Sequence, residues 1–161
     1  MTTQPSFEQK ICARPDFAAR AAGLPRPLVF TNGCFDVLHR GHVTYLAQAR
    51  ALGAALVVGV NSDASVKRLG KGDDRPVNSL ENRMAVLAAL ESVSLVAPFD
   101  EDTPLALILA CRPDVLVKGG DWKTDAIVGA SEVQSWGGAV HSIPFLHECS
   151  TTALLNKIRS L

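Results

Sequence analysis

The most informative stretch of the chain is residues 31–42, TNGCFDVLHRGH, which places two histidines three positions apart around a glycine. In a first helical turn, His39 and His42 would share one face and direct two imidazole donors at the same point. Gly41 between them would let a ligand approach the backbone. Imidazole and backbone N–H groups that converge in this way suit an anion. We therefore predict a phosphate site here.

The surrounding elements must place this stretch in a turn between a strand and a helix. Leu28 to Phe30 is a short apolar run that follows two prolines, which is typical of a buried strand. From Val43 to Leu52, apolar residues recur at helical spacing. Such a turn exposes unpaired N–H groups at the positive end of a helix dipole, which attracts anions.

Other interpretations of these residues stay open from the sequence alone. A His-x-x-His pair could bind zinc, but zinc needs further ligands, and His141 and His147 stand in no recognisable metal pattern. Each histidine of the pair could instead cap a helix or fill a gap in the core. Cys34 could be a nucleophile, although no base or orienting partner is evident. Phosphate binding is the interpretation that uses all of the conspicuous residues.

The pattern Gly-x-Phe-Asp-x-x-His-x-Gly-His of residues 33–42 resembles the signature of a nucleotidyltransferase superfamily. That superfamily includes cytidylyltransferases, phosphopantetheine adenylyltransferase and the class I aminoacyl-tRNA synthetases. The full pattern is far more specific than its four-residue core. The resemblance implies chemistry at the α-phosphate of a nucleoside triphosphate.

Length and composition indicate one enzyme-sized domain. The chain has 161 residues with 47% hydrophobic content, which can bury a core but is too short for two domains. Sixteen basic and sixteen acidic residues leave no net charge, so no global field favours nucleic acid or an anionic membrane. No apolar stretch approaches the ~20 residues of a membrane span, and no signal peptide is evident. We expect a cytoplasmic protein with small-molecule substrates and with reduced thiols.

Apolar runs alternate with helical patterns along the chain, which predicts parallel strands with crossover helices. We expect an α/β fold, a Rossmann-like doubly wound sheet of about five parallel strands with helices on both faces. Residues 27–161 would form this single nucleotidyltransferase domain, and residues 1–26 an N-terminal extension or helix. The predicted strands are Leu28 to Thr31, Leu56 to Val60, Ser94 to Ala97, Val115 to Val117 and Val140 to Ile143, and the predicted helices are 41–52, 79–90, 102–111, 126–135 and 151–160.

Ligands of such sheets bind beyond the carboxyl ends of the strands, and the polar motifs of this chain follow its predicted strands. After the second strand, Asn61 precedes Ser62 and Asp63, either of which could cap a short helix that carries Lys67. An ordinary cap with a solvated basic face is the alternative. The glycine-rich residues 70–76 predict a polar loop whose lysine and arginine could close over phosphates.

An arginine near the start of the helix predicted at 79–90 is unusual. Arg83 lies in the first turn, where a cation is unfavourable for the helix dipole. This cost suggests an anionic neighbour such as Glu81, or a ligand.

Two further motifs follow the fourth and fifth predicted strands. Lys118 precedes two glycines and Asp121, so a compact positive charge lies beside backbone that a ligand can approach. A tight turn with charges in water is the alternative. Ser150, Thr151 and Thr152 head the last helix and offer hydroxyls and N–H groups to a phosphate, although the run by itself is only a good N-cap.

The order of these segments narrows the resemblance, which extends from about residue 30 to residue 158. The chain is similar to the adenylyltransferases of ADP-heptose synthesis in six segments that follow one another in this order: FTNGCFD, VNSDASVKRL, RPVN, EDTP, LVKGGDW and CSTT. These are often the second half of a bifunctional protein with a sugar kinase; at this length we expect the stand-alone form. The resemblance implies transfer of AMP from ATP to D-glycero-β-D-manno-heptose 1-phosphate for lipopolysaccharide core synthesis. The alternative is a cytidylyltransferase or adenylyltransferase of another phosphorylated small molecule.

The resemblance also implies a role for each matching residue. The residues that stabilise charge on the phosphates would be His39, His42 and Lys67. Those that bind the nucleotide would be Asn32, Gly33, Cys34, Phe35, Gly41, Lys118, Gly119, Gly120, Asp121, Ser150, Thr151 and Thr152. Those on the sugar-phosphate side would be Asp36, Asn61 and Arg75, with Asp36 alternatively orienting a nearby basic group. Mg²⁺ would accompany ATP, held mainly by phosphate oxygens and water, so no protein metal ligand is predicted.

One departure bears on the choice of nucleotide. Related cytidylyltransferases carry Arg-Thr-Glu-Gly before their Ser-Thr pair, whereas residues 145–149 read FLHEC. The missing arginine weakens the cytidylyltransferase interpretation and leaves His147 or Arg75 as substitutes. Outside the enzymes, a nucleotide-binding regulator without turnover is the remaining alternative. The apolar patches at 87–90 and 105–109 could serve the core or a homodimer.

Overall fold

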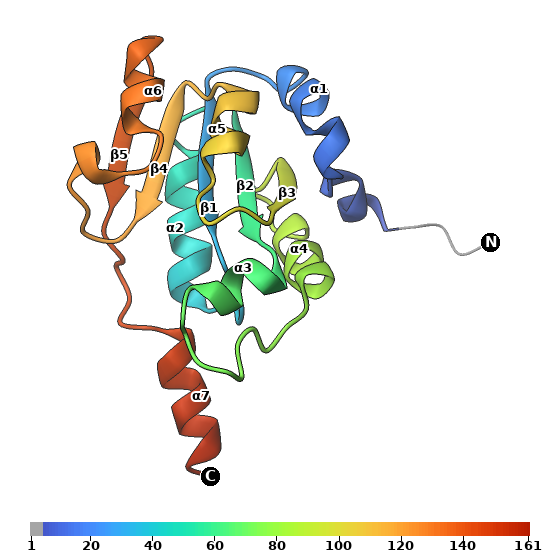
Figure 1. Cartoon of the computed structure of the whole chain (residues 1–161), viewed down its shortest axis with the longest axis vertical. Coiled ribbons are helices and arrows are strands. Elements are labelled where there is room, and N and C mark those ends of the chain that lie inside the picture. Colours follow the sequence, from blue (N-terminus) through green and yellow to red (C-terminus); the bar gives the residue numbers. More distant parts are fainter. Residues whose placement is uncertain (1–4) are drawn as a thin grey trace.

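The computed structural model describes residues 5–161 and contains a five-stranded parallel sheet of order β3-β2-β1-β4-β5 (Figure 1). The strands are β1 (Leu28–Gly33), β2 (Ala55–Asn61), β3 (Leu95–Phe99), β4 (Val115–Gly119) and β5 (Ala139–Ile143). The chain first builds outward from β1 to β3 and then crosses to the other side of β1 for β4 and β5. This order confirms the predicted Rossmann-like doubly wound sheet, and it reverses between β1 and β4.

Helices cover both faces of the sheet, as a parallel sheet requires. The α-helices are α1 (Phe17–Ala22), α2 (Arg40–Arg50), α3 (Asp63–Arg68), α4 (Leu80–Ala88), α5 (Leu105–Cys111), α6 (Ala130–Ser135) and α7 (Thr151–Arg159). Short 3-10 helices span Ser6–Lys10, Arg14–Asp16 and Thr124–Ala126.

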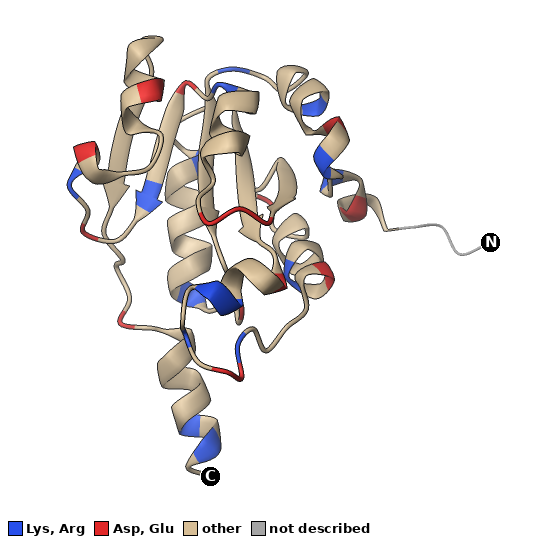
Figure 2. Cartoon of the chain, in the orientation of Figure 1, with Lys and Arg blue, Asp and Glu red and all other residues tan. Residues whose placement is uncertain are grey.

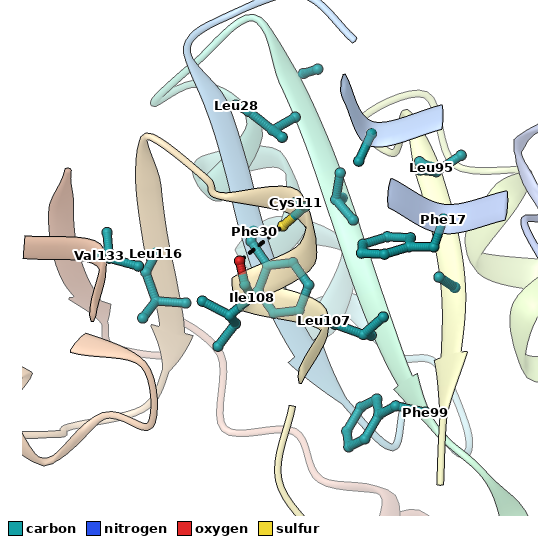
Figure 3. Close-up of a cluster of buried hydrophobic side chains, with 14 of the residues drawn as sticks. Phe17, Leu28, Phe30, Leu95, Phe99, Leu107, Ile108, Cys111, Leu116 and Val133 are labelled. Atoms are coloured by element: carbon teal, nitrogen blue, oxygen red, sulfur yellow. Dashed lines mark hydrogen bonds between the residues drawn. The ribbon is translucent and has the colours of Figure 1, made fainter. Parts of the chain in front are cut away.

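Alternate strand residues enter two separate cores. Leu28 and Phe30 of β1 face a core that α1, α5 and α6 cover, whereas Val29 faces the core beneath α2 and α4. Figure 3 shows the first core, in which Phe17 of α1 and Leu107 of α5 lie over the sheet. Together the two cores hold the strands rigidly, so the loops at their carboxyl ends project from a fixed support.

The observed helix boundaries differ from the predicted ones where backbone geometry intervenes. The helix predicted at 126–135 begins only at Ala130, because Gly129 adopts a φ of 86° that no helical residue has. The helix predicted at 102–111 begins at Leu105, directly after Pro104. β1 continues beyond its predicted end to Gly33, which pairs with Val60 of β2.

The cap that the sequence suggested at the carboxyl side of β2 is present. Ser62 caps α3, since its side chain accepts a hydrogen bond from the Ser65 N–H, and Ser79 caps α4 in the same way. The other cap candidate, Asp63, is the first residue of α3.

Arg83 of α4 has the anionic neighbour that its unfavourable position suggested, but the partner is not Glu81. Its side chain is completely buried, and Nη2 donates to Asp63 Oδ1 at 2.7 Å. The other two donors bind backbone carbonyls, Nη1 to Cys34 O at 2.7 Å and Nε to Asn78 O at 3.0 Å. One guanidinium therefore joins the turn after β1, the loop before α4 and the start of α3.

The apolar patches considered for a homodimer contribute mainly to the cores. Leu87, Leu107 and Ile108 are fully buried, whereas Leu109 is exposed. The homodimer therefore stays a prediction.

Within residues 5–161, no helix has both the length and the apolar content needed to cross a bilayer.

Cys12 and Phe17, from the segment predicted as an extension, are buried in the core beneath α1 and α5. The backbone N–H of Cys12 also donates to Val96 O of β3 at 2.8 Å. The segment before β1 thus packs on the sheet, and the division at residue 26 stays a prediction.

Candidate active site

A cavity of about 490 Å³ opens at the carboxyl ends of β1 and β4, where the strand order reverses. This is the place where doubly wound sheets bind their ligands. Its lining comes from β1, the turn after it, α2, the loop after α3, β4 and the start of α7, and consists of Asn32, Gly33, Cys34, Phe35, Asp36, His39, His42, Tyr45, Lys71, Arg75, Lys118, Gly119, Phe145, Cys149, Ser150, Thr151 and Thr152. The motifs read from the sequence therefore meet in one place.

The two histidines form a stack in the cavity wall. His39 is the N-cap of α2 and His42 lies in its first turn, and their ring centroids are 3.9 Å apart with planes inclined by 21°. A Cβ atom at Gly41 would lie 3.0 Å from the His39 ring, so glycine makes room for that ring. Both Nδ1 atoms are buried without a partner among the described residues. A ligand can therefore reach each ring only through Nε2.

The histidine pair is neutral at physiological pH. Burial, together with the proximity of His39 and Lys71, lowers the pKa of His42 to about 4. Burial also lowers the pKa of His39. A neutral imidazole still donates one hydrogen bond, and here the accessible donor is Nε2–H. The pair can thus bind phosphate oxygens without first taking up protons.

The depressed pKa predicts how stability depends on pH. In the unfolded chain a histidine titrates near 6.5, so between pH 6.5 and about 4 the unfolded state binds a proton that folded His42 does not. Stability should therefore fall as pH falls through this window. We expect a loss of ~1 kcal/mol between pH 7 and pH 5, less than the full shift implies because the ring is partly solvated. Urea unfolding at both pH values measures it.

The variant His42→Ala is the control for this pH dependence, since it removes the His42 ring and leaves only the contribution of His39, whose pKa is also lowered. Asp36 and Glu101, whose pKa values are lowered, lose their stabilising charge only below about pH 4.5. An equal loss between pH 7 and pH 5 in both proteins would show that His42 is not the source.

Three cations line the cavity, and two of them have no acidic partner among residues 5–161. Lys71 Nζ lies 3.6 Å from Cys34 Sγ, and Lys118 is the penultimate residue of β4, where burial lowers its pKa. Arg75 is paired with Asp36. Figure 2 shows basic positions at the end of β4, on α3 and in the last turn of α7. The cavity lining itself holds three cations and one acidic side chain, so it attracts anions although the chain has no net charge.

The start of α7 closes another side of the cavity. Ser150 caps the helix by accepting a hydrogen bond from the Ala153 N–H at 3.0 Å. Thr151 donates its hydroxyl to Val37 O at 3.0 Å, which ties α7 to the turn that carries the histidines. The rest of α7 extends away from the sheet (Figure 1). Within residues 5–161 the N–H groups of Thr151 and Thr152 and the Thr152 hydroxyl have no protein partner and remain for an anion.

The sequence profile of the cytidylyltransferase-like family matches residues 30–160, which contain every element of this cavity. The chain belongs to the cytidylyltransferase-like family. It is 61% identical over 155 residues to the D-beta-D-heptose 1-phosphate adenylyltransferase of Bordetella bronchiseptica, across 95% of this chain and 96% of that protein.

Two further comparisons place this cytidylyltransferase-like chain among its relatives. It is 56% identical over 141 residues to the bifunctional protein HldE of Hahella chejuensis, across 88% of this chain but 29% of that protein. Among solved structures, a lipopolysaccharide core biosynthesis protein from Thermoplasma volcanium superimposes with a TM-score of 0.62 at 28% identity. That match covers 76% of this chain and 98% of the other.

Sequence reasoning missed an aromatic wall in this cytidylyltransferase-like cavity. Tyr45 and Phe145 meet edge to face with ring centroids 5.7 Å apart. A Cβ atom at Gly119 would lie 2.8 Å from Phe145 Cζ, so glycine lets that ring lie against the end of β4. Tyr45 stands one helical turn beyond His42, a spacing that could have identified it. Nothing in the sequence around Phe145 signals its position.

Five residues with predicted roles lie outside the cavity lining, namely Gly41, Asn61, Lys67, Gly120 and Asp121. Lys67 is exposed on α3, and Asp121 is exposed beyond β4 next to Gly120. Asn61 is buried, where it contacts Cys34 and Ser65. The lysine of this region that does line the cavity is Lys71. The other predicted residue outside the lining, Gly41, lies within α2 behind His39.

Of the two candidates to replace the missing arginine, Arg75 lines the cavity and His147 does not. The remaining predicted residues are all in the lining. Their individual roles stay predictions.

Proposed function

We propose that the chain transfers AMP from ATP to D-glycero-β-D-manno-heptose 1-phosphate, forming ADP-heptose and pyrophosphate for lipopolysaccharide core synthesis. The observation that carries the chemistry is the stacked pair of His39 and His42, which presents neutral donors into a cavity with cationic walls at the strand-order reversal. The high identity to a heptose 1-phosphate adenylyltransferase over nearly all of both chains supports the choice of substrates.

The cavity suits in-line displacement at the α-phosphorus. An oxygen of the sugar phosphate attacks and pyrophosphate leaves, and because the attacking phosphate is already ionised, no general base is needed. Asp36 is the only acidic side chain in the lining that the structure describes, and Arg75 holds it. The enzyme must align two polyanions and neutralise charge on the departing group. The Nε2–H donors of the histidine pair and the ammonium groups of Lys71 and Lys118 meet this need.

The layout of the cavity supports a different side for each substrate. Nucleotides occupy the crevice at the switch point, where Lys118, Gly119 and the start of α7 line the cavity. Arg75 reaches the cavity from the loop between α3 and α4, on the β2 side of that crevice. We therefore place the triphosphate between β1 and β4 and the phosphate of the acceptor beside Arg75.

We propose that the protein supplies no magnesium site of its own. Among residues 5–161, no group of three or more potential ligands comes together, and Asp36 is already saturated by hydrogen bonds. We propose that Mg²⁺ arrives with ATP and is held by phosphate oxygens and water. Because ATP is the donor, we also propose that the reaction takes place in the cytoplasm.

Pyrophosphate release tests this proposal. With D-glycero-β-D-manno-heptose 1-phosphate and Mg²⁺, we expect rapid pyrophosphate release from ATP and at least ~10-fold slower release from CTP. The expected ratio is modest because the two nucleotides differ in the base and make the same phosphate contacts. α-D-Mannose 1-phosphate serves as the control acceptor. Faster release from CTP would identify a cytidylyltransferase. Binding of ATP without release from any sugar phosphate would support a regulator instead.

A further inference from the structure

The carboxylate of Asp36 is completely buried, and every donor that reaches it comes from one short segment. Oδ2 accepts a hydrogen bond from Arg75 Nε at 2.6 Å, and Oδ1 accepts one from the Asn78 N–H at 2.9 Å. The Val77 N–H lies 2.9 Å from both oxygens. In return, Asn78 Nδ2 donates to the Asp36 carbonyl at 2.7 Å. The turn after β1 is thereby fastened to the loop before α4.

These bonds leave Asp36 no capacity to bind a ligand. A carboxylate has about four acceptor positions, and the three donors fill them through four contacts. Burial favours a higher pKa for Asp36, but the hydrogen bonds from Asn78, Val77 and Arg75 outweigh it and lower the pKa. The Asp36 carboxylate thus stays ionised, and its charge acts on the Arg75 guanidinium.

Arg75 has the complementary arrangement. Its side chain is 8% exposed and lines the cavity, and Nε is the donor that Asp36 holds. Its Nη1 and Nη2 atoms have no acceptor within residues 5–161, and both are accessible to solvent. The accessible edge of the guanidinium therefore faces the cavity. Two parallel N–H donors on a planar group match the oxygens of a phosphate.

We propose that Asp36 is a positioning residue: it fixes the Arg75 guanidinium at the angle that receives the phosphate of the acceptor substrate and never contacts a ligand itself. Asp36 lies in the same turn as the histidine pair, so it also sets the separation between Arg75 and the rings. This assignment rests on the proposed function, because it takes the acceptor to be a phosphate.

A double-mutant cycle with Asp36→Asn and Arg75→Gln tests the assignment. Each single variant should raise KM for the acceptor by at least ~10-fold, the scale of a charge-assisted hydrogen bond, and leave KM for ATP within about 3-fold. The double variant should be no worse than Arg75→Gln alone, because Asp36 acts through Arg75. The control is Asp74→Asn in the same loop, which removes an exposed ion pair with Arg159; its KM values should be unchanged.

Three outcomes would overturn the assignment: unchanged acceptor KM in Asp36→Asn, equal increases in the two KM values, or effects of the two substitutions that multiply in the double variant. Should Asp36→Asn fail to fold, Arg75→Lys decides the matter, since it keeps the charge but loses the Nε anchor and should raise acceptor KM equally. Should the wild type release no pyrophosphate with the heptose phosphate, the proposed function fails. The cycle is then measured on the Kd of inorganic phosphate, where the same non-additivity is expected.

Discussion

Replacing His42 with alanine is expected to lower kcat for adenylyl transfer by about 10²-fold or more, the scale for losing a preorganised transition-state donor. The ring lies in the cavity wall with Nε2 as its only accessible donor. Charge on the phosphates grows as pyrophosphate departs, so the lost bond is stronger in the transition state than in the ground state. KM for ATP should change much less than kcat. Steady-state pyrophosphate release measures both constants.

His141→Ala is the matched control for this substitution. His141 is exposed on β5 and does not line the cavity. The control variant should retain wild-type kcat. If His42→Ala turned over at a near-normal rate, His42 would have no catalytic role, and the neutral donor pair would be a packing feature.

The second large effect is expected on stability. Arg83→Met should lower the free energy of unfolding by ~3 kcal/mol, because it leaves one buried and one partly buried backbone carbonyl without this donor. The lost bonds are those to Cys34 O and Asn78 O, and Asp63 loses its partner as well. Methionine keeps most of the volume, so the loss reports the hydrogen bonds and the ion pair rather than a cavity. Urea denaturation at pH 7.5 measures it.

Arg14→Met provides the comparison for an arginine at the surface. Arg14 forms an ion pair with Glu101 in which both side chains are well exposed, so its loss should cost less than ~1 kcal/mol. Similar values for the two variants would contradict a structural role for the buried guanidinium. A stable Arg83→Met protein would also mean that the loops after β1 and β2 are held together by other contacts.

Local pattern was enough to predict the sheet class and most of the cavity. Apolar runs that alternate with helical periodicity indicate parallel strands, and ligands of such sheets bind at the carboxyl ends of the strands. The sequence pattern therefore predicts that the histidine turn, Lys118 and the start of the last helix lie together, and all of them line one cavity. These features are local because each depends on residues close to one another in the chain.

Only the tertiary structure decided which residues of distant segments contact each other. Sequence spacing suggested Glu81 as the partner of Arg83, whereas the fold supplies Asp63 from another helix. Lys71 rather than Lys67 faces the cavity, since the loop after α3 turns back toward β1. Phe145 reaches the end of β4 only because β4 and β5 are neighbours.

The clearest case is Asp36, for which the sequence left open both the sugar-phosphate side and the orientation of a nearby basic group, and which the fold pairs with Arg75. Which donor a carboxylate receives depends on how loops far apart in sequence are folded against each other. Periodicity carries no information about that arrangement, because it records only which face of an element is buried. The sequence by itself thus determined where the chemistry lies, and the packing of the loops decided which side chains perform it and which hold them in place.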